Sequence, residues 1–147
     1  MKIAIGSDHA GFELKEKVKV ILETLGHEIN DFGTDSTESV DYPDFGLKVA
    51  NAVASGDVDR GVTICCTGNG MNILANKIDG IRATLALNAD MAMLARAHND
   101  SNVLTLASKY IENSQLEEIL KAWLDTEFEG GRHLRRLSKI PGSGIAE

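Results

Sequence analysis

The sequence predicts an α/β protein: a single domain built as a three-layer sandwich, with helices covering both faces of a five-stranded, mainly parallel sheet. Three observations support this prediction. Short apolar or β-branched runs alternate with longer helical patterns along the chain, as they do in βαβ units. The run GVTICC at 61–66 is apolar throughout, as expected for a central parallel strand with both faces buried. The 147 residues contain no internal repeat, low-complexity tract or linker, so we expect one domain over 1–147.

Five strands are predicted from the short runs. They are KIAIGS at 2–7, HEINDF at 27–32, GVTICC at 61–66, RATLAL at 82–87 and NVLTLAS at 102–108. Parallel sheets of this kind bind ligands where their strands end. The segments to inspect are therefore Ser7-Asp8-His9, the loop after Phe32, the CCTGNG segment, the region of Asn88, and Ser108-Lys109.

The helices are predicted from apolar spacing and from their ends. The first has apolar residues three and four positions apart and ends at Gly26. The second covers 41–56 with Pro43 near its first turn, and a short third helix runs from about Gly70 to Ile78. Asn88 can cap the fourth, ADMAMLARAH. The last helix opens with a capping box, Ser114-Gln-Leu-Glu117, and its buried face holds Leu116, Ile119, Leu120 and Trp123.

Composition excludes several classes of function. The net charge of −7 disfavours nucleic-acid binding, which depends on neutralising phosphates. The apolar runs are too short for a membrane span or a signal peptide, so we expect a cytoplasmic protein whose two cysteines stay reduced. The segment GGRHLRRLSK at 130–139 is basic. This segment fits a binding site for one anionic small molecule, and it fits equally well a run of charges that is simply exposed to solvent.

Standard motifs are incomplete. Gly6 to Gly11 has the glycine spacing of a P-loop but lacks its lysine, and no G-x-S-x-G elbow is present. Asp31 ends a strand where a dinucleotide-binding fold has its ribose-binding acid, but G-x-G-x-x-G is not completed. A nucleotide-dependent oxidoreductase is therefore a weak alternative. The two cysteines are adjacent and the four histidines are scattered, so we expect no metal site.

The CCTGNG segment is the strongest candidate for chemistry. Glycine-rich backbone at a strand end, followed by a helix start, can expose N–H groups that bind an anion and stabilise a thiolate. A second candidate is His98, which shares a helical face with Met91, Leu94 and Ala95 and begins the polar run HNDSN. Asp8 could hold a ligand or merely cap the first helix.

The chain resembles the ribose-5-phosphate isomerase type B family, whose relatives include galactose-6-phosphate and allose-6-phosphate isomerases. The resemblance rests on six motifs in order between residue 5 and about residue 137: S-D-H-A-G-F, D-Y-P-D, I-C-x-T-G-N-G, A-N-K with G-I-R-A, H-N-D-S-N and E-G-G-R-H. It implies a Rossmann-like fold and a metal-free, cofactor-free aldose–ketose isomerase of the pentose phosphate pathway, which works through a cis-enediolate.

The same resemblance implies the site residues. Cys65 matches the catalytic base, and the backbone of Cys66, Thr67, Gly68, Asn69 and Gly70 would bind the enediolate oxygen. His98 would open the sugar ring with help from Thr67. Asp8 and Asn99 would hold hydroxyls, and the phosphate would be bound by His9, Arg132 and Arg136. In the family the arginines cross a dimer interface, so the tail from about 130 would complete a neighbouring subunit's site in a dimer or tetramer.

The chain departs from the family at three positions. Cys66 stands where Gly is usual, and a positive φ there would strain a residue with a Cβ. Lys109, a further candidate for substrate contact, stands where Arg is common, and Ala107 replaces a common Gly. Some members use a glutamate base at the position of Met71, which cannot accept a proton. Two alternatives stay open: an isomerase of a six-carbon sugar phosphate such as allose 6-phosphate, and a noncatalytic sugar-phosphate binding module.

Overall fold

Five strands and six α-helices form the protein in a computed structural model that describes residues 1–146. In chain order they are β1 (Lys2–Ser7), α1 (Phe12–Thr24), β2 (Glu28–Asp31), α2 (Tyr42–Ser55), β3 (Arg60–Cys65), α3 (Asn69–Ala75), β4 (Ala83–Leu85), α4 (Ala89–Asn99), β5 (Val103–Ala107), α5 (Leu116–Asp125) and α6 (Arg132–Leu137). A 3₁₀ turn, Asn113–Gln115, precedes α5. Glu147, the last residue of the predicted domain, lies outside the described residues.

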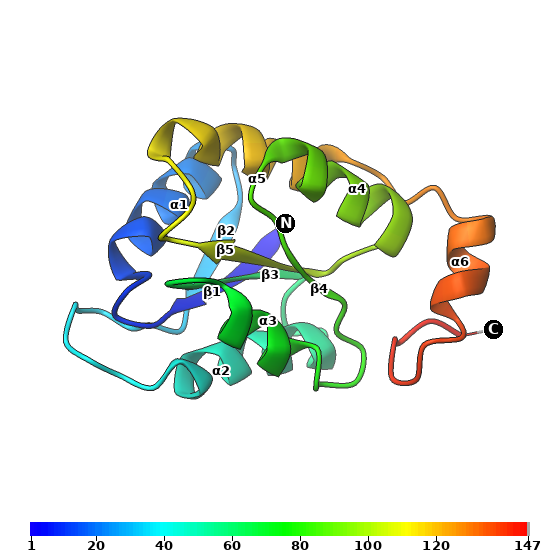
Figure 1. The fold of residues 1–147 in the computed structure, drawn as a ribbon, viewed down its shortest axis with the longest axis horizontal. Coiled ribbons are helices and arrows are strands. Elements are labelled where there is room, and N and C mark those ends of the chain that lie inside the picture. The colour runs from blue at the N-terminus through cyan, green and yellow to red at the C-terminus, as the bar shows by residue number, and fades with distance from the viewer. Residues whose placement is uncertain (147) are drawn as a thin grey trace.

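The sheet has the order β2-β1-β3-β5-β4, and every neighbouring pair is parallel. Helices α1, α4 and α5 cover one face and α2 and α3 cover the other (Figure 1). The predicted α/β sandwich is therefore confirmed.

Alternating strand residues fill two cores. Ile3 and Ile5 point toward α1, α4 and α5, where Trp123 is fully buried. Ala4, between them, packs with Val49 and Val53 of α2 on the opposite face. Both faces of the central strands are thus buried, which explains why their sequences are apolar throughout.

Most predicted ends of elements are confirmed. Pro43 lies in the first turn of α2, and Gly56 ends that helix at φ +80°. The Asn88 side chain accepts a 2.9 Å hydrogen bond from the Met91 N–H and caps α4. These capping contacts satisfy backbone groups that a helix leaves unpaired at its ends.

Two local predictions are corrected. The capping box before α5 is formed by Glu112 and Gln115 around the 3₁₀ turn, and not by Ser114 and Glu117. The 3₁₀ turn precedes the α-helix, so the cap lies two residues earlier than the sequence pattern suggested. The basic tail also contains α6, a helix that the sequence did not predict.

Among the described helices, none is both long enough and apolar enough to span a bilayer.

Candidate active site in two halves

The first half of the site lies at the carboxyl edge of the sheet. Ser7 pairs with Ile64, and Cys65 pairs with Ala107, so β1, β3 and β5 end side by side. Asp8, Cys66 and Ser108 follow these ends directly. Two backbone hydrogen bonds, Asp8 N–H to Ile64 O at 3.2 Å and Ser108 N–H to Cys65 O at 3.0 Å, continue the sheet into the loops. The segments that follow these three strands therefore lie together at the carboxyl edge, as the sequence predicted.

Cys65 occupies the centre of this half. The residue is only 5% exposed, and the backbone N–H groups of Gly68 and Met71 lie near its sulfur. Burial raises the pKa of the Cys65 thiol and nearby Asp8 adds to the rise, while the two N–H groups lower it; the pKa is raised on balance. The sulfur is therefore a protonated thiol at neutral pH, beside donors that favour its thiolate.

The loop after Cys65 takes its shape from two glycines. Gly68 has φ +78°, and a Cβ there would lie 2.4 Å from Leu85 Cδ1. A Cβ on Gly70 would lie 2.6 Å from the Tyr42 ring. Asn69 N–H points back to Thr67 Oγ1 at 3.4 Å. The loop backbone is thus held between β4 and the start of α2, with no room for larger side chains at either glycine.

Cys66 does not need glycine's conformational freedom. The φ angle of Cys66 is not positive, because Asp100 is the one non-glycine residue with a positive φ among residues 1–146. Its side chain is exposed and lines a pocket of about 370 Å³ together with Lys17 and Lys109. The Cβ of Cys66 therefore causes no backbone strain in this loop. Ala107 is also accommodated, since it is fully buried.

Met71 belongs to the core. It is fully buried, and a Cβ on Gly46 of α2 would lie 2.4 Å from its sulfur. The position that carries a glutamate base in part of the resembling family is therefore occupied here by a side chain that joins α3 to α2. Cys65 is left as the candidate base.

Asp8 and His9 border the same edge. Asp8 is buried, and its Oδ1 accepts a 2.9 Å hydrogen bond from Gly11 N–H at the turn into α1. Its Oδ2 makes no hydrogen bond within residues 1–146. His9 Nδ1 accepts the Val40 N–H at 3.1 Å, which places the proton of the neutral ring on Nε2. Both side chains thus keep one polar atom for a ligand.

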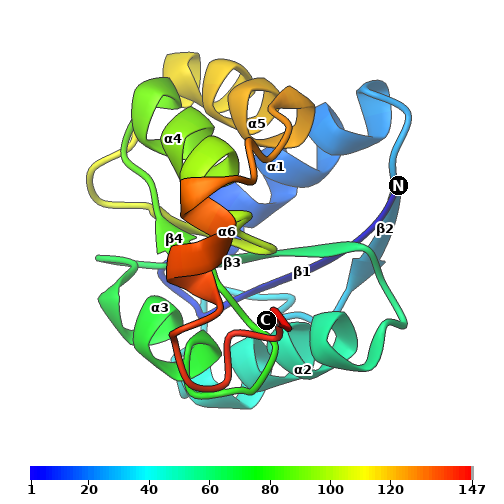
Figure 2. The same ribbon diagram turned by 90° about the vertical axis from the view of Figure 1, so that its right-hand side faces the viewer.

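The second half of the site lies at the opposite end of the sheet. Helix α4 runs back from the carboxyl edge, so His98 and Asn99 at its end precede the start of β5. Arg132 and Arg136 lie on α6, which packs against α4 at that end. Figure 2 shows α6 just below the end of α4, in front of the sheet. The length of β5 separates the two ends, roughly 15 Å at about 3.3 Å per residue. One chain therefore does not bring His98, Asn99, Arg132 or Arg136 to its own Cys65.

His98 is surrounded by groups that sequence reasoning missed. Its ring stacks on that of His133, with centroids 4.2 Å apart and planes within 10°. Glu129 Oε2 lies 3.4 Å from His133 Nε2 and 4.0 Å from His98 Nε2. Burial lowers the pKa of His133, and the positive charges of His98 and the neighbouring arginines add to this effect. His98, Asn99, His133 and Arg136 line one pocket of about 260 Å³.

The rest of the HNDSN run has a structural role. Asp100, at φ +45°, ends α4 and forms ion pairs with Arg96 at 2.8 Å and Arg82 at 3.1 Å. Ser101 Oγ accepts the Trp123 indole N–H at 2.8 Å. The polarity that drew attention to His98 thus comes partly from residues that anchor the end of the helix. Arg82 of the GIRA segment is thus paired with Asp100 of the HNDSN run.

Asp31 is unavailable to a dinucleotide. Its carboxylate binds Lys15 and Lys19, each at 2.7 Å, and accepts the Gly33 N–H at 2.9 Å. Burial alone would raise the pKa of Asp31, but the lysines and this N–H hold it below its ordinary value. Since Lys15 is itself 1% exposed, Asp31 neutralises a buried cation. This removes the basis for the oxidoreductase alternative.

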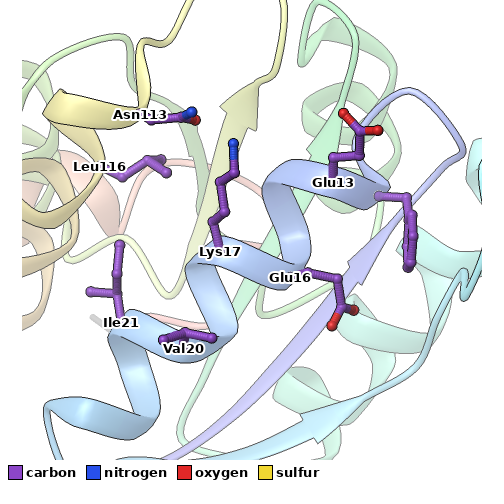
Figure 3. A pocket seen from close by; sticks show the side chains of 8 residues that line it. Glu13, Glu16, Lys17, Val20, Ile21, Asn113 and Leu116 are labelled. Carbon is purple, nitrogen blue, oxygen red and sulfur yellow. The ribbon is translucent and has the colours of Figure 1, made fainter.

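A further hollow lies outside both halves. It has a volume of about 670 Å³ and is bounded by α1 and the start of α5. Figure 3 shows its side chains, with Val20, Ile21 and Leu116 as apolar lining and Lys17 extending past them. None of the predicted site residues lines it.

Comparison with known proteins agrees with this architecture. The family model described as Ribose/Galactose Isomerase matches residues 3–140. Ribose-5-phosphate isomerase B of Escherichia coli is 46% identical over 139 residues, covering 95% of this chain and 93% of that protein. The structure of Clostridium thermocellum ribose-5-phosphate isomerase B superposes with a TM-score of 0.93 at 52% identity, covering 95% and 94% of the two chains. The Mycoplasma genitalium enzyme with bound ribulose-5-phosphate superposes with a TM-score of 0.89 at 40% identity, covering 94% and 92%.

Proposed function

The chain belongs to the ribose/galactose isomerase family, and from that premise we propose that it interconverts ribose 5-phosphate and ribulose 5-phosphate. The observation that carries the proposal is Cys65, a buried thiol at the carboxyl edge that lies near two backbone N–H groups and near Asp8. The choice of a pentose is supported by the names of the E. coli and C. thermocellum relatives and by the ribulose-5-phosphate bound to the M. genitalium enzyme.

In the proposed reaction Cys65 moves one proton between two carbons. The minor fraction of Cys65 that has released its proton to solvent acts as the base. This thiolate removes the proton from C2 of the open-chain aldose, the electron pair forms the C1=C2 double bond, and the carbonyl oxygen becomes the enediolate oxygen. The thiol then returns the proton to C1, while the hydroxyl proton passes from O2 to O1. Backbone N–H groups of the loop from Cys66 to Gly70 stabilise the negative oxygen as it forms. These steps use no metal and no cofactor.

His98 opens the sugar ring as a general acid–base, with the Thr67 hydroxyl on the other side of the substrate. His98 is partly exposed, so a substrate can reach it. Asp8 Oδ2 and Asn99 hold sugar hydroxyls. The phosphate is bound by His9 Nε2–H and by Arg132 and Arg136, with Lys109 nearby; guanidinium groups are well suited to this charge-assisted geometry.

This assignment requires two copies of the chain, because the half with Cys65 and the half with His98 lie at opposite ends of the sheet. We therefore propose a homodimer, or a tetramer made of two such dimers, in which each site takes Cys65 from one subunit and His98 from its partner. The elements near the edge strand β4 carry apolar side chains that an interface would cover: Ile73 is 62%, Met91 40%, Leu94 38% and Leu134 43% exposed. The reaction needs a free thiol, which suits the reducing cytoplasm.

A direct assay tests the proposal. Purified protein with EDTA should convert ribose 5-phosphate to the ketopentose, and Cys65→Ala should lower kcat at least a thousandfold while the protein still binds the sugar phosphate. Cys66→Ser is the matched control and should keep most activity. Turnover of allose 6-phosphate in place of ribose 5-phosphate would contradict the substrate assignment, and binding without turnover of either sugar would indicate a binding module.

A further inference from the structure

We propose that His98, Glu129 and His133 form a binding site for a zinc-class divalent cation, and that occupation of this site inhibits the enzyme. Among residues 1–146, these three side chains alone form a group of His, Cys, Asp or Glu residues that could hold a metal ion, and their ligand atoms lie within 4.8 Å of one another. The inhibitory part rests on the proposed function, because it depends on the role of His98 in ring opening.

The three ligand atoms are close to a coordinating arrangement. A tetrahedral zinc ion with bonds of about 2.0–2.1 Å sets its ligand atoms roughly 3.3 Å apart. Glu129 Oε2 and His133 Nε2 are already 3.4 Å apart, and His98 Nε2 is 4.0 Å from the same oxygen. The stacked rings lie within 10° of parallel, so the His98 ring must tilt for both lone pairs to meet at one ion. That ring is 37% exposed and has room to do so.

His133 supplies an independent reason to expect a ligand. The residue is only 7% exposed, yet its Nε2 is buried and forms no hydrogen bond. Glu129 Oε2 lies close to this nitrogen without the alignment of a hydrogen bond. Buried polar atoms in native proteins nearly always have a partner. A cation between His133 and Glu129 would provide one.

A backbone hydrogen bond and a glycine turn hold Glu129 and His133 beside His98. Glu129 N–H donates to Ala97 O at 3.0 Å and ties Glu129 to the end of α4, one residue before His98. Gly130 and Gly131 follow with φ of +67° and +53°, a reversal that other residues rarely adopt. The turn brings His133 back under the His98 ring. The EGGRH motif thus builds the cluster as well as presenting the arginines.

The donor set selects the type of ion. Two imidazole nitrogens and one carboxylate oxygen suit Zn²⁺, and the fourth position stays open to water. Arg136 lines the same pocket, and its positive charge opposes a cation. We therefore expect a dissociation constant of roughly micromolar, well above the values of closed structural zinc sites.

Metal binding would engage the lone pair that His98 needs for proton transfer. It would also add positive charge beside the arginines that take the substrate phosphate. Metal and sugar phosphate should therefore compete for the site, and a chelator should reverse the inhibition by the metal.

The experiment measures binding and activity on the same metal-stripped protein. Titration calorimetry with Zn²⁺, and the visible spectrum with Co²⁺, should give one site per chain. Glu129→Gln and His133→Asn should each weaken Zn²⁺ binding at least tenfold, whereas His27→Asn and Glu118→Gln, which lie outside the cluster, should not. In the activity assay, with each protein compared to its own turnover without metal, Glu129→Gln should lose the inhibition by micromolar Zn²⁺ that the unchanged protein shows.

Two results would overturn the proposal. One is unchanged Zn²⁺ affinity in both Glu129→Gln and His133→Asn, which would assign any bound zinc to the thiols. The other is an altered pH profile of turnover in Glu129→Gln with no change in Zn²⁺ binding, which would make the cluster a proton relay. Because binding is measured without turnover, a protein that binds zinc at this cluster but lacks isomerase activity would support the metal site and contradict the proposed function.

Discussion

The thiol of Cys65 is subject to two opposing effects. Burial raises its pKa, and the N–H groups of Gly68 and Met71 oppose the rise without cancelling it. Cys66, the next residue, is exposed. Two adjacent cysteines thus differ in environment because neighbouring side chains on an extended strand point to opposite sides, and only the structure determines which one faces the interior.

The raised pKa of Cys65 predicts alkaline reactivity. In the Cys66→Ser variant Cys65 is the only cysteine, since the chain has two. Its alkylation by iodoacetamide should accelerate about tenfold per pH unit from pH 7 to 9 without a plateau, because the thiolate is the nucleophile. Loss of activity should follow the same curve. A plateau below about pH 8, under the ordinary thiol value, would contradict the assigned environment.

At the scale of elements, the carboxyl end of α4 shows how His98 is held in position. Asp100 pairs with Arg96 and Arg82, which are largely buried. The chain reverses there at φ +45°, a conformation that Asn tolerates nearly as well as Asp. The element that presents His98 and Asn99 is therefore anchored by these ion pairs as well as by the apolar packing of its buried alanines.

The variant Asp100→Asn isolates that charge. It should lower the free energy of unfolding by about 1–3 kcal/mol, less than for a fully buried pair, because the arginines keep their carbonyl partners and Asp100 is partly exposed. Urea denaturation measures the change, with Asp90→Asn in the exposed first turn of α4 as control. A loss under about 0.5 kcal/mol, the range of ordinary surface substitutions, would show that the ion pairs do not anchor the helix.

Helices and strands were predictable where their apolar pattern extends over enough residues to be recognised. The strands were predicted to within a residue or two, because buried parallel strands are short apolar runs. The exception is β4, predicted over six residues but only three long, since an edge strand pairs on one side alone. Helix α6 was missed because RHLRRL is too short to show a helical period. The Glu129–His98–His133 cluster depends on the positive φ angles of Gly130 and Gly131. No periodic pattern in the sequence indicates that these three side chains meet.

At the scale of the whole molecule, the rule that ligands bind at the carboxyl edge accounts for only half of the proposed site. Asp8, His9 and the loop after Cys65 lie there as expected. His98, Asn99 and the arginines lie at the other edge because a helix that follows a parallel strand must run back before the next strand begins. The separation of the two groups in the folded chain is what leads to the proposed second copy, which the family resemblance alone had implied from the sequence.

Mixing of inactive subunits is a direct test of the shared active site. Cys65→Ala and His98→Asn chains, each inactive alone, are unfolded together, refolded at equal concentration and assayed with ribose 5-phosphate. In a mixed dimer one site receives both substitutions and the other receives neither, so random pairing predicts recovery of roughly a quarter of the wild-type activity. Activity that stays at the level of the separate variants, with mixed dimers confirmed by native mass spectrometry, would contradict the account.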